Sequence, residues 1–111
     1  MADGREWRIS EHFRRDRAGD RPEVNKDRII DVLENWVVRC TTVDKDKREG
    51  LSHWGWVDVN NKRKLMQVVT SPSSDGIIES AYLNRRDLRE MNRGNIQHFR
   101  AKSVRDDFEA R

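Results

Sequence analysis

The sequence predicts an α+β fold in which two N-terminal helices pack on a four-stranded antiparallel meander, followed by a basic C-terminal helical segment. Two observations lead to this fold class. Four runs of β-branched and aromatic residues follow one another in the middle of the chain, joined by links of hairpin length. Before them, apolar residues recur at helical spacing. The 111 residues are close to the size of one domain.

Two helices are expected ahead of the sheet. Ser10 is a good N-cap for a short helix over residues 11–17, and Asn25 for a second helix over residues 26–35. The second helix carries an apolar face at helical spacing, so we expect it to pack on the sheet. The residues expected to be buried at this contact are Ile29, Leu33, Val68 and Ile78.

The central strands are predicted over residues 36–43, 51–59, 62–70 and 77–83. Asn60 and Asn61 separate the second strand from the third, and Asn tolerates the positive φ that a two-residue hairpin turn requires. A serine-rich stretch with a Pro and a Gly over residues 71–76 forms the next turn. These links favour antiparallel neighbours.

The remaining segments complete the predicted organisation. Asn84 caps a helix that ends at Gly94, and residues 95–110 form another amphipathic helix with a sparse apolar stripe. The domain prediction has three parts. Residues 1–7 form a flexible N-terminus, residues 8–93 a single α+β domain, and residues 94–111 an amphipathic, charged C-terminal helix or tail.

Composition and motifs argue against several classes of protein. The N-terminus has no apolar signal segment, and no stretch approaches the ~20 apolar residues of a membrane helix. We therefore expect a soluble, cytoplasmic protein without a membrane partner. The single Cys40 lies in an apolar run, which predicts an inert buried thiol. The histidines lack zinc spacing and no phosphate-binding Gly-rich loop occurs, so no metal or cofactor is expected.

Positive charge gathers after the last predicted strand. Between residues 84 and 105 the chain has seven basic residues and two acidic ones. Such an excess can face a polyanion. The alternative is a solvated helix face with ordinary salt bridges. The candidate nucleic-acid-binding residues are Arg85, Arg86, Arg89 and Arg93.

The side chains near the predicted sheet could cleave RNA without a metal. The 2′-hydroxyl attacks the adjacent phosphate, and the enzyme supplies a base, an acid and cations. His12 is the candidate acid or base, Arg15 and Lys64 would steady the phosphate, and Tyr82 would orient or stack on a base. Alternatively, these four residues occupy ordinary surface positions and have no catalytic role.

Trp54 and Trp56 share one face of a predicted strand. Two roles are open for them. They fill the core beneath the helices, or they form a stacking platform for unpaired bases.

The stretch ISEHFRRDRAGDRPEVNKDRIIDVLENW resembles a small bacterial domain family allied to the RelE-like and barnase-like ribonuclease toxins. The segment KLMQVVTSPSSDGIIESAYLN is similar to the closing hairpin of that family. The resemblance spans residues 8–83 and rests on short motifs. The matching positions are Ser10, His12, Arg15 or Arg17, Arg21, and residues 29–36.

The resemblance implies an RNA-directed RelE-like domain. One form of it is a metal-independent endoribonuclease toxin held by an antitoxin-like protein partner. The alternative is a non-catalytic protein-interaction or regulatory domain on the same scaffold, because fold similarity does not fix activity.

Overall fold

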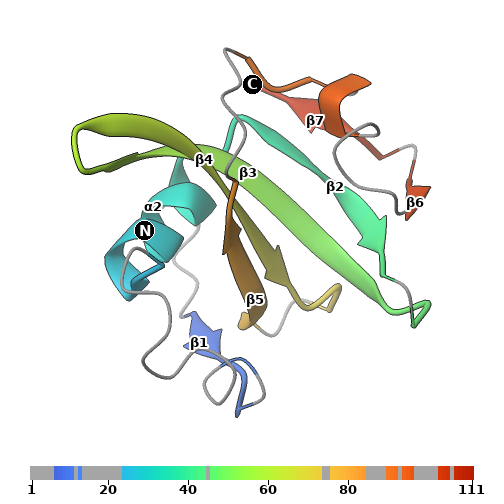
Figure 1. Ribbon diagram of the computed structural model, residues 1–111. Coiled ribbons are helices and arrows are strands. Elements are labelled where there is room, and N and C mark those ends of the chain that lie inside the picture. Colours follow the sequence, from blue (N-terminus) through green and yellow to red (C-terminus); the bar gives the residue numbers. More distant parts are fainter. Residues whose placement is uncertain are drawn as a thin grey trace.

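A computed structural model describes residues 7–11, 13, 24–44, 46–73, 76–84, 90–92, 94–96, 103–105 and 107–111. Seven strands form one mixed sheet in the order β1-β5-β4-β3-β2-β6, and β7 also pairs with β2 (Figure 1). The elements are β1 (Arg8–Ile9), α2 (Lys26–Glu34), β2 (Val38–Val43), β3 (Glu49–Val59), β4 (Lys62–Thr70), β5 (Ile77–Leu83), β6 (Ser103–Val104) and β7 (Glu109–Ala110).

The four long strands lie where the sequence predicts them, and consecutive strands pair antiparallel. β3 and β4 form a long hairpin through the middle of the molecule (Figure 1). Its turn residues Asn60 and Asn61 have φ values of 52° and 64°. Both angles lie in the left-handed region that a type I′ turn needs and that Asn tolerates.

The predicted fold class is nevertheless wrong. The sheet is mixed, because β1 runs parallel to β5. It is also larger than a four-stranded meander, because β6 and β7 pair with the outer edge of β2. Among the described residues, only α2 is a helix of several turns, so two N-terminal helices are not seen.

The predicted continuous helix over residues 95–110 is wrong, because two short strands lie within it. Its apolar stripe is too sparse to hold a helix against the sheet, whereas β2 offers an edge of unpaired backbone groups. Two pieces of the segment, Ser103–Val104 and Glu109–Ala110, therefore pair with that edge. The domain boundaries stay a prediction, and most of the predicted helix over residues 85–93 lies outside the described residues.

Hydrogen bonds at its two ends explain where α2 begins and where it ends. The side-chain oxygen of Asn25 accepts a hydrogen bond from the Arg28 backbone N–H at 2.9 Å, and Asp27 places negative charge in the first turn. The helix ends at Asn35, whose backbone N–H donates to the carbonyl of Asp31 at 2.8 Å. At the other predicted helix, Ser10 Oγ accepts from the Phe13 N–H at 3.1 Å, but most of that segment lies outside the described residues.

An apolar cluster lies on each face of the sheet. The helix α2 covers one face, where Ile29, Leu33, Val68 and Ile78 are all buried as predicted. A Cβ on Gly55 would lie 3.3 Å from a Val32 methyl group, so glycine lets the helix come close to β3. The cluster on the opposite face contains Val38, Cys40, Trp54, Leu65 and Ile96.

Trp54 is fully buried in this second cluster, so it fills the core, and Trp56 packs partly buried against the same cluster. The Cys40 thiol is buried as well, in agreement with the prediction. None of the described helices is long and apolar enough to cross a membrane.

The contact between α2 and the sheet predicts a large cost for Leu33→Ala. Leu33 is 7% exposed, and truncation removes apolar contact and leaves a cavity. We expect a loss of ~2–5 kcal/mol in the free energy of unfolding, measured by urea titration followed by circular dichroism. Lys26→Ala, an exposed change on the same helix, is the control. A Leu33→Ala midpoint equal to that of the control would contradict this packing.

Candidate functional site

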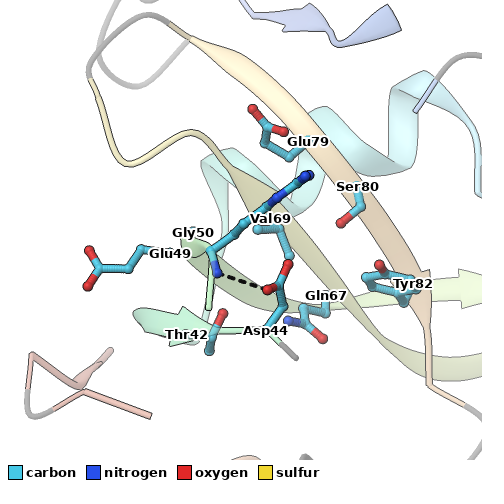
Figure 2. Close-up of a pocket in the computed structure, with 10 residues that line it drawn as sticks. Thr42, Asp44, Glu49, Gly50, Gln67, Val69, Glu79, Ser80 and Tyr82 are labelled. Atoms are coloured by element: carbon cyan, nitrogen blue, oxygen red, sulfur yellow. Dashed lines mark hydrogen bonds between the residues drawn. The ribbon is translucent and has the colours of Figure 1, made fainter. Parts of the chain in front are cut away.

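A cavity of about 330 Å³ opens on the face of the sheet opposite α2 (Figure 2). Gln67 on its wall lies between Met66 and Val68, which both belong to the helix-side cluster. Successive strand residues point to opposite faces, so Gln67 faces away from α2. The lining residues are Thr42, Asp44, Arg48, Glu49, Gly50, Gln67, Val69, Glu79, Ser80 and Tyr82.

Three buried polar side chains connect β2, β3 and β4 at the inner wall. The hydroxyl oxygens of Thr42 and Ser52 lie 2.7 Å apart, and Gln67 Nε2 donates to Ser52 Oγ at 3.0 Å. These side chains are 8%, 0% and 4% exposed. Because buried hydrogen bonds of this kind fix side-chain orientation, the amide of Gln67 is held against the wall.

Gly50 makes room for the cavity wall. A Cβ at this position would lie 2.5 Å from Cγ1 of Val69, closer than real Cβ contacts. Val69 faces the cavity from β4, so a side chain on Gly50 would push it into the cavity. The absence of a side chain at residue 50 is therefore a condition for the present shape.

The loop between β2 and β3 forms one rim. Asp44 Oδ1 accepts hydrogen bonds from the backbone N–H groups of Asp46 and Arg48, at 2.8 and 2.9 Å. Figure 2 shows the second of these bonds as a dashed line at the edge of the cavity. Glu49 Oε1 pairs with Arg105 Nη2 at 2.9 Å, between two half-exposed side chains.

The opposite rim comes from β5. Tyr82 is 39% exposed and is the exposed large hydrophobic side chain of the described residues. Tyr82 pairs in register with Gln67. Ser80, two residues earlier in β5, lies on the same face. Val69 pairs with Ser80 and Thr70 with Ile78, so Glu79 is the extra residue of a β-bulge. Ser80 and Tyr82 both line the cavity, so they lie on the same face of β5.

The site offers hydrogen bonds and a stacking surface. Three carboxylates and one guanidinium lie on its walls, beside the hydroxyl and amide groups. His53 faces the α2 side, buried, with Nδ1 3.3 Å from the carbonyl of Val68. In the part of the chain that the structure describes, no group of three potential ligands could hold a metal ion.

The structure separates two of the predicted catalytic residues. Lys64 pairs with Val57, a member of the helix-side cluster, whereas Tyr82 pairs with Gln67 on the cavity side. Their side chains therefore lie on opposite faces of the sheet. The other candidates lie outside the described residues: His12, Arg15, Arg85, Arg86, Arg89 and Arg93.

Several cavity residues were missed by the sequence analysis. Thr42, Ser52 and Gln67 are polar residues that alternate in phase with the apolar residues Cys40, Trp54 and Leu65 of the same strands, and this is the signal that could have identified them. Arg48 and Asp44 carry no such signal, because charged residues are ordinary in a loop.

The C-terminal segment lies next to the site along β2. Val104 pairs with the cavity residue Thr42, and Asp107 fills the gap between β6 and β7. The backbone N–H of Thr41 donates to Asp107 Oδ1 at 2.9 Å, and its hydroxyl donates to Oδ2. Burial acts to raise the pKa of Asp107, but the hydrogen bonds from Thr41 and the charge of Arg105 outweigh it, so the pKa lies below 3.8.

Comparisons of the chain with protein-family models, with curated proteins and with solved structures find no match.

Gly50→Ala tests the shape of the cavity wall. The new methyl group clashes with Val69, so we expect a loss of ~1–3 kcal/mol in the free energy of unfolding. Adding Val69→Ala removes the clashing methyl groups and should recover part of that loss. Urea unfolding of the two single variants and the double variant gives the coupling energy. Strictly additive effects would show that the two residues do not compete for this space.

Acidification tests the anchoring of the C-terminal segment. Because the folded-state pKa of Asp107 is lowered, its bonds to Thr41 stabilise the fold above pH 3.8, and this contribution is lost as the pH falls through the lower folded-state value. When the pH is lowered from above 3.8 to below it, the free energy of unfolding should fall less for Asp107→Asn than for the parent. Asp58→Asn, an exposed change on β3, should behave like the parent. Equal acid losses in parent and Asp107→Asn would contradict this anchoring.

Proposed function

We propose that this protein is an RNA-directed domain that binds single-stranded RNA through the cavity on the open face of its sheet. The observation that carries the proposal is the position of Tyr82. This exposed ring stands at the rim of a cavity whose walls bear amide and hydroxyl groups. Proteins recognise unpaired bases by this combination of an aromatic surface and hydrogen-bonding groups.

The size of the cavity fits bases and not a duplex. Its volume of about 330 Å³ is near the lower end of the range for small-ligand pockets. Bases of an extended strand could enter while the sugar-phosphate backbone stays outside. A double helix keeps its bases stacked inside and could not present them to Tyr82.

The charge distribution directs the phosphates away from most of the rim. Asp44, Glu49 and Glu79 line the cavity and disfavour a polyanion, although Glu49 is paired with Arg105. Arg48 is the cation on the described wall. The predicted phosphate-binding residues Arg85, Arg86, Arg89 and Arg93 follow Tyr82 closely in the sequence.

Cleavage of the bound RNA is the further part of the proposal. A RelE-like toxin would use His12 as acid or base and Arg15 as a phosphate contact, without a metal, in the cytoplasm, and an antitoxin-like protein would hold it. Lys64 is the weakest member of the proposed catalytic set, because it faces away from Tyr82.

One observation favours the alternative function, a non-catalytic protein-interaction domain. The cavity walls carry three carboxylates and one guanidinium. Such a wall attracts a lysine or arginine side chain of a protein partner.

Substitutions of Tyr82 test RNA binding. Loss of one base stack is worth ~1–3 kcal/mol, so Tyr82→Ala should weaken binding of a fluorescent single-stranded RNA about 5- to 150-fold. Tyr82→Phe keeps the ring and should bind within about twofold of the parent. Fluorescence anisotropy at low salt gives the affinities, and thermal melting checks that each variant folds.

The same RNA, incubated with the parent protein and EDTA, tests cleavage. Cut RNA supports the ribonuclease form of the proposal, and bound but intact RNA restricts it to binding. No RNA binding at low salt, together with binding of a lysine-rich peptide that Glu79→Gln weakens, would favour the interaction domain.

A further inference from the structure

The buried polar contacts leave one hydroxyl proton directed at the cavity. Ser52 Oγ accepts a hydrogen bond from Gln67 Nε2. Ser52 is fully buried, so its own proton also needs an acceptor, and Thr42 Oγ1 at 2.7 Å is the acceptor within reach among the described residues. Ser52 therefore donates to Thr42.

Thr42 is then a donor without an acceptor in the described part of the protein. Its side chain is 8% exposed and lines the cavity. An unsatisfied buried donor costs more free energy than an oxygen lone pair left without a partner. The hydroxyl is thus best satisfied by an acceptor atom on a ligand.

Thr42 and Tyr82 cannot serve the same base. Thr42 lies on β2 and Tyr82 on β5, and Figure 2 shows them at separate walls with Gln67 between them. Three strand intervals of ~4.8 Å separate β2 from β5, which is more than the width of one base. The cavity therefore has two subsites, one at each end.

The acceptor at the Thr42 end belongs to a neutral group. In register, Thr42 pairs with Gly50 and the next pair is Val43 with Glu49, so the carboxylates of Asp44 and Glu49 lie at this end. A phosphate would meet these charges, whereas a base carbonyl would not. Uracil, cytosine and guanine offer a carbonyl oxygen, whereas adenine offers only ring nitrogens as acceptors.

We propose that Thr42 forms a second base subsite, in which its hydroxyl donates to the carbonyl of a uracil, cytosine or guanine in the same RNA strand as the base stacked on Tyr82. This inference rests on the proposed binding of single-stranded RNA. The domain would accordingly read two bases of one strand, one by stacking and one by its carbonyl. Ser52 and Gln67 are positioning residues, because they fix the direction of the Thr42 proton.

Homopolymeric RNA separates the two subsites. Thr42→Val removes the donor, and a lost hydrogen bond corresponds to about a tenfold change in affinity. We expect Thr42→Val to weaken binding of a uridine hexamer about tenfold and of an adenosine hexamer less than about twofold. Thr42→Ser keeps the hydroxyl and should retain the parent's affinity for both. Tyr82→Ala should weaken both hexamers to a similar extent.

Two further measurements complete the experiment. Thermal melting identifies any loss of folding in Thr42→Val, and Ser52→Ala, which leaves Thr42 in place, should reduce the preference for uridine. An equal effect of Thr42→Val on both hexamers would mean that the hydroxyl contacts the sugar or an adenine ring nitrogen, and it would overturn the carbonyl subsite while RNA binding stands. An unchanged affinity for both hexamers would overturn it in the same way. If the parent binds neither hexamer, the RNA-binding proposal and this inference both fail.

Discussion

The alternation of side chains along β3 and β4 assigns every residue of this hairpin to one face of the sheet, and the other features of the molecule depend on that assignment. Met66 and Val68 point toward α2, and Gln67 between them points toward the cavity. A shift of one residue in register would exchange these faces and place the amide of Gln67 under the helix. The turn at Asn60 and Asn61 fixes the register, so the core and the site are set by the same hairpin.

The edges of the sheet show a second constraint. An open strand edge leaves backbone groups unpaired and invites association, and here short pieces from both ends of the described chain lie along the edges. β1 pairs with β5, and β6 and β7 pair with β2. Polar contacts hold the C-terminal pieces: Arg39 Nη2 pairs with Glu109 Oε2 at 2.9 Å, and the guanidinium groups of Arg39 and Arg111 lie 4.4 and 3.9 Å from the ring of Trp36. Because β2 also carries Thr42, this edge and the cavity share a strand.

The face of the sheet opposite α2 carries an apolar cluster at one end and buried polar side chains at the other. At one end, Trp54, Leu65 and Val38 form an apolar cluster, and at the other end Thr42, Ser52 and Gln67 are buried polar groups. Apolar residues would pack at those positions without any need for hydrogen bonds, so three connected polar side chains there are costly unless they are satisfied. Thr42 and Gln67 both form a hydrogen bond with Ser52, and Thr42 and Gln67 line the cavity. For this reason we assign the function to these polar side chains and the cavity beside them.

Local periodicity and turn chemistry were enough to predict several features from the sequence. These include the four long strands, the Asn60–Asn61 turn, the cap of α2 at Asn25 and the burial of residues such as Ile29 and Val68. It did not determine the fold class, because strands of two residues have no periodicity and β1, β6 and β7 form only where a longer strand offers an edge. It also grouped Lys64 with Tyr82, since strand partners and faces depend on register. Thr42, Ser52 and Gln67 lie on three strands, and only pairing of those strands brings them together, because cross-strand neighbours are decided by tertiary contacts and not by distance along the chain.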